Sequence, residues 1–295
     1  MAVGGFISTI GKNTMLNRTY KAVPDYTAIT EFKVGIGTTT PTVADTDIET
    51  QVPLSGTESV DACDATTGWT ASASDAVATT TNYYKEGTAA LTLSKAATGV
   101  VTCDMDKTTT SRDFTSKTLW TFVYISSTLY ALLEASGTAV EIRFGSDNAN
   151  YYNKTYTKAN LAAGWNYLHY TSATASGTTG SPVIGSCDYT YISYVTAAIG
   201  STTSADDFVV DDFKVASQDD YEKIFVTGYP TFNETDKTVT VRAFLNTLEA
   251  NGYPVTEIVT QNTDGTPRLM GHDVINEQSK SNLDEFAFVI VDEMV

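Results

Sequence analysis

The sequence is short of basic residues, histidine, cysteine and long apolar runs. Its 18 Lys and Arg stand against 35 Asp and Glu, which gives a formal charge of −17 at pH 7. Binding to nucleic-acid phosphates needs clustered Lys and Arg, so this composition argues against a nucleic-acid partner. No window approaches the roughly 20 consecutive apolar residues that span a bilayer, so we also expect no membrane span.

The first residues and the cysteines bear on the compartment in which the chain folds. The opening MAVGGFI lacks the basic start and the long apolar stretch of a signal peptide, so we expect folding in a cytoplasm. Cys63, Cys103 and Cys187 are odd in number and share no metal-ligand spacing. This favours reduced, small apolar side chains over a disulfide framework. A Cys103–Cys187 bridge stays open as the alternative.

Catalytic motifs are also scarce. His169 and His272 are the only histidines, and neither has a serine elbow or a metal-ligand spacing around it. There is no phosphate-binding loop and no dinucleotide fingerprint. We therefore predict that the chain is not an enzyme. Paired carboxylates for glycoside cleavage stay open, because two such residues can meet from anywhere in a β fold.

What the sequence does contain is short strand-like segments. Hydrophobic residues make up 42%, with 17 Tyr and 12 Phe, and the apolar runs are rich in Thr, Val and Tyr, which indicates an all-β fold. In the run 120–126, Trp120, Phe122 and Tyr124 alternate with smaller residues, as in a strand. Between 57 and 218 the predicted strands are 89–93, 99–104, 119–125, 140–144, 165–170, 189–195 and 208–215. Seven short strands separated by turns indicate a β-sandwich or jelly roll.

The composition changes twice along the chain. Residues 57–218 are low in charge and rich in Ser, Thr, Ala, Tyr and Gly, whereas the charge density rises again from 219 onward. In the last part, 237–245, 255–261, 267–275 and 286–291 read as strands, with a turn at Asp264-Gly265. The composition therefore divides the chain into 1–56, a jelly-roll β-sandwich at 57–218, and a second β-rich part at 219–295.

Four short motifs of the middle segment carry a resemblance. They are DACDATTGW (61–69), YKEGTAAL (84–91), GWNYLHY (164–170) and the closing FVVDDFKV (208–215). The segment resembles the jelly-roll carbohydrate-binding modules and their galactose-binding-like relatives, which share a Gly-Trp after the opening strand, a Glu-Gly segment, a Gly-Trp-Asn and a last strand with a central Asp. Together the motifs span nearly the whole segment.

This resemblance implies a structural calcium. Such modules hold the ion between the opening strand, the Glu-Gly loop and an aspartate of the last strand, and calcium takes hard oxygen ligands. The matching positions here are Asp61, Asp64, Glu86 and Asp212, with Asp211 as a substitute. The alternative is that these carboxylates are solvated edge residues that discourage strand pairing.

Tyrosines are the candidates for sugar binding. Tyr83, Tyr151, Tyr152, Tyr189 and Tyr191 could form a platform on which sugar rings stack, since an aromatic face offers apolar contact and the phenol a hydrogen bond. The alternative is that most of them are core or half-buried sheet residues. We assign Trp69, Trp120 and Trp165 to the core.

The flanking segments carry a second resemblance. Residues 29–56 and 239–295 are similar to tail-fibre and tail-collar proteins of tailed bacteriophages, in which a Gly-rich stretch precedes a strand and an EANG segment leads into another strand and a DGT turn. Ile48 stands where Leu is usual. The matching positions are Gly35, Gly37, Pro41, Thr46, Asp47 and Glu49, and then Glu249, Ala250, Asn251, Gly252, Val255, Thr256, Glu257, Asp264, Gly265 and Leu269.

The two resemblances together imply a small β attachment domain made of 1–56 and 219–295, split in sequence by an inserted jelly-roll β-sandwich at 57–218. They lead to a functional hypothesis. We expect a structural virion protein of a tailed phage, folded in the host cytoplasm, that docks on the particle through its flanking domain. It would contact other virion proteins as a homo-oligomer, a trimer or a ring, and would project the jelly roll for weak multivalent binding to a host surface glycan. The alternatives are a carbohydrate-active enzyme or its accessory module, and a passive structural lobe that binds nothing.

Overall fold

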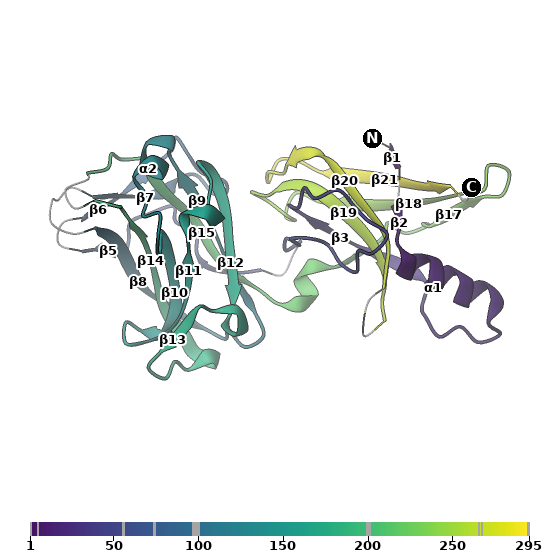
Figure 1. The fold of residues 1–295 in the computed structure, drawn as a ribbon, viewed down its shortest axis with the longest axis horizontal. Coiled ribbons are helices and arrows are strands. Elements are labelled where there is room, and N and C mark those ends of the chain that lie inside the picture. The colour runs from purple at the N-terminus through teal and green to yellow at the C-terminus, as the bar shows by residue number, and fades with distance from the viewer. Residues whose placement is uncertain are drawn as a thin grey trace. The chain divides into compact units, whose positions relative to one another are not determined.

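The chain divides into two compact units. Unit 1 comprises Met1–Gly56 together with Asp219–Val295, and unit 2 comprises Thr57–Gln218 (Figure 1). The computed structural model describes residues 2–4, 6–54, 57–72, 75–95, 101–198, 202–264, 266 and 268–293. Gly265 of the predicted turn and Gly99 at the start of a predicted strand lie outside these ranges.

Unit 2 is a sandwich of two antiparallel sheets, which confirms the all-β prediction. The first sheet has the strand order β13-β11-β10-β14-β8-β5, and the second has the order β12-β9-β15-β7-β6, with β4 pairing with β15. The strands of the first sheet are β5 (Thr70–Ala71), β8 (Thr102–Arg112), β10 (Val140–Asp147), β11 (Asn150–Tyr156), β13 (Gly177–Thr179) and β14 (Cys187–Val195). Those of the second are β4 (Glu58–Asp61), β6 (Asp75–Thr80), β7 (Ala90–Lys95), β9 (Thr118–Ile125), β12 (Gly164–Thr171) and β15 (Phe208–Ala216).

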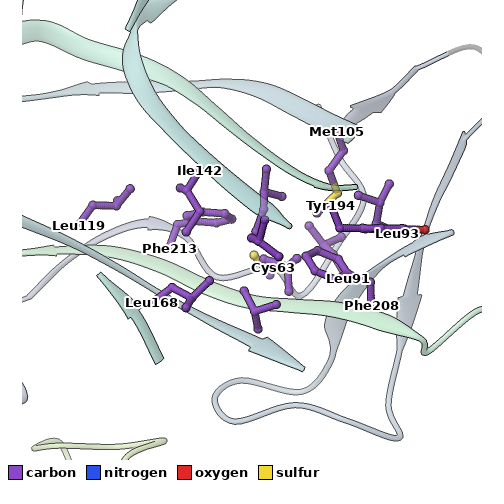
Figure 2. Close-up of a cluster of buried hydrophobic side chains, with 14 of the residues drawn as sticks. Cys63, Leu91, Leu93, Met105, Leu119, Ile142, Leu168, Tyr194, Phe208 and Phe213 are labelled. Carbon is purple, nitrogen blue, oxygen red and sulfur yellow. The ribbon is translucent and has the colours of Figure 1, made fainter. Parts of the chain in front are cut away.

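Alternation along these strands builds one hydrophobic core between the sheets. In β10, Val140, Ile142 and Phe144 belong to the core cluster, so the residues between them face away from it. Figure 2 shows part of this cluster, with Ile142 and Tyr194 of the first sheet near side chains of the second. The labelled residues are Cys63, Leu91, Leu93, Met105, Leu119, Ile142, Leu168, Tyr194, Phe208 and Phe213.

Three features of unit 2 differ from a regular sandwich or from the expectations above. A short helix, α2 (Ser127–Leu132), follows β9, and its first turn is capped by the Ser126 hydroxyl. Strand β15 has a bulge at Asp212, whose φ of +51° lies in the left-handed region. Short 3₁₀ helices also occur. They are η1 (Lys158–Asn160), η2 (Ser172–Thr174), η3 (Ile184–Ser186) and η4 (Gln218–Tyr221), which begins at the last residue of unit 2 and continues into unit 1.

Within the residues described, unit 1 contains two sheets and one α-helix. The sheets have the orders β1-β21-β18-β17 and β16-β3-β19-β20-β2. Their strands are β1 (Ala2–Gly4), β2 (Phe6–Ile7), β3 (Ile29–Gly35), β16 (Lys223–Ile224), β17 (Thr231–Asn233), β18 (Thr238–Leu245), β19 (Pro254–Asn262), β20 (Leu269–Ser279) and β21 (Phe286–Glu293). The helix α1 (Thr9–Tyr20) begins at Ser8, whose hydroxyl accepts a hydrogen bond from the Gly11 amide.

The cysteines and the helices bear on two further expectations. Cys63, Cys103 and Cys187 are all buried and free, so the alternative Cys103–Cys187 bridge is absent. Burial raises the pKa of the Cys187 thiol to about 11, which keeps it protonated at neutral pH. Within the described ranges, neither helix has the length and apolar character needed to cross a membrane.

Candidate functional site

The outward face of the first sheet of unit 2 carries a row of two tyrosines and an arginine. Arg143 lies in β10 between the core residues Ile142 and Phe144, so its side chain faces away from the core. The Arg143 guanidinium carbon lies 4.0 Å from the ring centroid of Tyr191 in β14 and 4.5 Å from that of Tyr151 in β11. We call Tyr151, Arg143 and Tyr191 the tyrosine–arginine row.

A carboxylate fixes the guanidinium between the two rings. Arg143 Nε and Nη2 donate to the two carboxylate oxygens of Glu141, both at 2.9 Å, and Asn153 Nδ2 donates to Glu141 Oε1 at 3.0 Å. Burial lowers the pKa of Arg143, but the bidentate pair with Glu141 outweighs it, and the net pKa is raised. Arg143 Nη1 has no hydrogen-bond partner among the described residues, so it still offers donors. The row is therefore a preorganised arrangement with unused hydrogen-bonding capacity.

Acidic side chains flank the row on the side of β8. Asp106 lies directly opposite Tyr191, and Asp104 lies opposite Ser193. Burial, and next the charge of Asp106, raise the pKa of the Tyr189 phenol, so the phenol stays protonated. The pKa of Tyr191 is raised to about 12, first by burial, and the nearby Asp104 carboxylate acts in the same direction. The face thus combines aromatic rings, carboxylate acceptors and one guanidinium.

The structure brings together three of the five predicted tyrosines. Tyr151, Tyr189 and Tyr191 lie on this face, where Tyr151 is half-buried and Tyr189 and Tyr191 are buried, at 5% and 8% exposure. Tyr152 does not, because it points the other way from β11 and packs against the core beside Phe114. Its assignment to the platform was wrong.

The fifth tyrosine, Tyr83, belongs to the other sheet. Its ring stacks on that of Tyr124 with centroids 4.1 Å apart, in the loop between β6 and β7. This contact fastens the loop to the second sheet, so Tyr83 is not part of the tyrosine–arginine row.

Sequence reasoning also missed Arg143, Glu141 and Asn153. A signal was available, since Glu141 and Arg143 alternate with three apolar residues in VEIRF and therefore had to share the outward face. One tryptophan assignment was wrong as well. Trp69 and Trp120 are buried, but Trp165 is only half-buried and faces outward from β12, edge-on to Tyr124 at 5.6 Å.

Two of the four predicted calcium ligands already have their carboxylates occupied by protein donors. Asp61 accepts hydrogen bonds from the Cys63 amide at 2.8 Å and from Trp69 Nε1 at 3.3 Å, and it forms an ion pair with Lys107. Asp64 Oδ1 accepts from the amides of Thr88 and Ala89, at 2.7 and 2.8 Å.

The other two ligands share one ammonium group. Glu86 Oε1 and Asp212 Oδ2 each lie 2.7 Å from Lys214 Nζ. In the described part of the chain, no group of three or more His, Cys, Asp or Glu side chains is arranged to hold a metal ion. The donor set therefore does not fit the predicted calcium.

The substitute ligand, Asp211, has a different role. Its Oδ2 accepts from the amides of Lys85 and Glu86, at 2.5 and 2.9 Å, and so holds the loop between β6 and β7. Its Oδ1 is buried without a hydrogen-bond partner among the described residues. Burial raises the pKa of Asp211 to about 7, so the group is partly protonated at neutral pH.

The two histidines lie in separate units. His169 is exposed and stacks on Trp120 with ring centroids 4.2 Å apart. In unit 1, His272 Nδ1 lies 2.8 Å from Asp45 Oδ2 and Nε2 lies 3.0 Å from Glu257 Oε2. The hydrogen bond with Glu257 raises the pKa of His272 against the effect of burial. Glu257 also accepts from backbone amides of residues 37, 49 and 50, so the cluster anchors this loop.

Comparisons with known proteins find structural similarity to β-sandwich modules. No family model matches the chain, and no curated protein matches it. A family 11 carbohydrate-binding module of Clostridium thermocellum, solved in complex with a β-1,3-1,4-mixed-linked tetrasaccharide, is 14% identical with a TM-score of 0.38, covering 55% of this chain and 96% of that one. A family 22 xylan-binding domain of Paenibacillus barcinonensis is 14% identical with a TM-score of 0.28, covering 54% and 90%. These low values carry no weight for function, which has to be argued from the chain's own geometry.

Proposed function

We propose that unit 2 binds carbohydrate through the outward face of its first sheet, at the tyrosine–arginine row. One observation carries this proposal. The Arg143 guanidinium is held between the rings of Tyr151 and Tyr191 and is fixed by Glu141, on a sheet face that points away from the core. Fixing an arginine side chain in one conformation costs up to about 2 kcal/mol of rotamer entropy. An arginine with no binding role would be expected to keep that freedom.

The chemistry of this face suits sugar rings. A pyranose has apolar C–H faces that pack on aromatic side chains, and hydroxyl groups that both donate and accept hydrogen bonds. Arg143 Nη1 can donate to a hydroxyl, and the carboxylate of Asp106 can accept from one. Tyr191 is only 8% exposed, so a sugar would stack on Tyr151 and bond to Arg143, and a sheet face suits a polymer that runs along it better than a small molecule that needs enclosure.

The test is retention of the full chain on polysaccharides in native affinity electrophoresis, with neutral plant glucans, xylan and bacterial surface polysaccharides in the gel. Tyr151→Ala is expected to weaken binding about tenfold, which corresponds to about 1.4 kcal/mol for one lost aromatic contact. Tyr84→Ala is the matched control, since Tyr84 is 46% exposed in the loop over the other sheet. Equal losses in both variants, or no retention on any polymer, would refute the proposal.

We further propose that this face binds sugar without cleaving it. The carboxylate nearest the row, Glu141, forms two hydrogen bonds with Arg143, which stabilise its ionised form and oppose a role as proton donor. Assay of new reducing ends after long incubation with any retained polysaccharide tests this, and their appearance would contradict it.

A second proposal concerns unit 1, as the attachment domain of a tailed-phage virion protein. The phage-like sequence of the flanks supports it, and so does the way the chain passes through unit 1. The Leu54 amide donates to the Asp220 carbonyl at 2.7 Å, so the chain leaves and re-enters unit 1 at one place. Thr57–Gln218 is inserted in the sequence between these two residues, which supports the proposal. Sedimentation equilibrium of the full chain is expected to show a trimer or ring, and a monomer at all concentrations would count against it.

A further inference from the structure

A buried ammonium group lies where the resemblance to carbohydrate-binding modules places a metal ion. Lys214 projects from β15 on the face away from the core, and it is 5% exposed. Its Nζ lies 2.7 Å from Glu86 Oε1 and 2.7 Å from Asp212 Oδ2, and 4.8 Å from the ring centroid of Phe122. The two carboxylates come from different elements, the loop between β6 and β7 and the bulge of β15. Lys214 therefore joins the same two elements that a bridging cation would join.

The charge on Lys214 is maintained despite its burial. Desolvation lowers the pKa of a buried ammonium, but the charges of Asp212 and Glu86 and their hydrogen bonds to Nζ outweigh it, and the net pKa of Lys214 is raised. A divalent cation placed between Glu86 and Asp212 would lie within hydrogen-bond range of this ammonium. Like charges at that separation repel strongly in a site with little water.

The bulge at Asp212 explains how Asp211 and Lys214 come to share the outward face. In a regular strand Asp212 and Lys214 would share a face two residues apart, and Asp211 would point to the opposite face. The extra residue, with Asp212 at φ +51°, leaves Asp211 and Lys214 both on the outward face. Asp211 then accepts the loop amides while Lys214 neutralises the loop carboxylate Glu86.

We propose that the Lys214 ammonium is the resident cation of this corner, so that unit 2 needs no metal, and that removing the side chain opens a divalent-cation site. The corner borders a cavity of about 150 Å³ lined by Glu86, Gly87, Asp212 and Lys214, together with Thr57, Ser59 and Ala62, which gives an ion a route from solvent. This inference does not depend on the sugar-binding proposal.

The first test compares melting of the full chain in EDTA and in millimolar calcium chloride. All three tryptophans lie within 57–218, so tryptophan emission reports on unit 2 without separating the units. The melting temperature is expected to agree within about 1 °C in the two conditions, because no cation binds the folded state. A clear fall in EDTA would overturn the proposal.

Two variants of Lys214 complete the test. Lys214→Met keeps the stem and removes the charge, so the buried Asp212 carboxylate loses its ion pair with Lys214, and melting should fall by about 5 °C or more with no response to calcium. Lys214→Ala removes the stem as well and leaves room for an ion. Its melting temperature should rise by about 2 °C or more in millimolar calcium. Lys154→Ala, which removes the same charge from the first sheet, is the control and should not respond.

The two variants also give the results that would refute each part of the proposal. If Lys214→Ala shows no calcium response in melting and no heat of calcium binding by titration calorimetry, the corner does not become a cation site. If Lys214→Met melts as the wild-type chain does, Lys214 is not the cation that holds the corner together.

Discussion

Asp211 is a fully buried carboxyl group with only one hydrogen-bonded oxygen. Its Oδ2 holds the amides of Lys85 and Glu86, whereas its Oδ1 has no partner among the described residues. Burial, together with the nearby charges of Asp212 and Glu86, raises its pKa from 3.8 to about 7 despite the two amide hydrogen bonds. The folded unit therefore holds a proton that the unfolded chain releases.

The raised pKa of Asp211 predicts how the stability of unit 2 depends on pH. Between the unfolded value of 3.8 and the folded value of about 7, the folded state binds more protons than the unfolded state, so the free energy of unfolding falls as pH rises through this window. Asp211→Asn keeps an acceptor for the two amides and removes the titration. Urea unfolding followed by tryptophan emission at pH 4, 5, 6, 7 and 8 should show a smaller decline in the variant. Parallel pH profiles would contradict the assignment.

Single residues show which parts of the site the sequence could predict. The outward positions of Glu141 and Arg143 follow from alternation with Val140, Ile142 and Phe144, so the tyrosine–arginine row was open to prediction. The position of Lys214 on the same face as Asp211, beside the loop carboxylate Glu86, was not, because it depends on a bulge that strand periodicity does not indicate. The calcium site stays a prediction that these contacts oppose, since a motif match shows which carboxylates are present and not which cation they face.

At the scale of elements, strands were easier to predict than helices. Strand β9 was expected at 119–125 and occupies Thr118–Ile125, because aromatic and β-branched residues alternate there. Helix α1 was not predicted. Its sequence TIGKNTMLNRTY contains three Thr, two Asn and a Gly, all weak helix formers, and its start depends on the Ser8 cap. Its position also depends on a distant contact, the bond from the Ser8 hydroxyl to the Leu269 carbonyl at 2.7 Å.

The carboxylates of Asp64 and Asp211 accept hydrogen bonds from backbone amides of the loop between β6 and β7 and so hold its conformation. Gly87 has φ +67°, and a Cβ added there would lie 2.5 Å from both carboxylate oxygens of Asp64. Gly87→Ala must therefore adopt a strained backbone and also displace the Asp64 carboxylate that caps the loop. We expect it to lower the free energy of unfolding by about 2–4 kcal/mol.

A second glycine provides the control for this prediction. Gly68 has φ +80°, but a Cβ there would meet only the Lys107 side chain, with its Cε at 3.2 Å, which can move. Gly68→Ala should cost about 1 kcal/mol, for backbone strain alone. Urea unfolding measured by tryptophan emission decides the comparison. Equal losses in the two variants would mean that contact with Asp64 adds nothing.

At the scale of the whole molecule, the points where the chain passes from one unit to the other lie side by side within each unit. In unit 2, the first strand β4 pairs with the last strand β15, so that Glu58 lies opposite Val215. In unit 1, Leu54 is hydrogen-bonded to Asp220. The change in composition at residues 57 and 218 falls at the limits of unit 2. The pairing of distant flanks could not be derived from composition, because it joins strands such as β3 and β19 that are more than two hundred residues apart.

This arrangement predicts that each unit folds without the other. Residues 57–218 expressed alone should melt, by tryptophan emission, within about 3 °C of the transition seen in the full chain, since their core cluster lies entirely within that range. Residues 1–54 joined to 220–295 through a short Gly-Ser linker should likewise give a cooperative transition by circular dichroism, because the linker replaces an insertion whose ends already meet. If both pieces are unfolded, the units depend on each other for stability, and the insertion model is wrong. If only the joined flanks fail, unit 2 is the independent module and unit 1 requires it or further copies of the chain to fold.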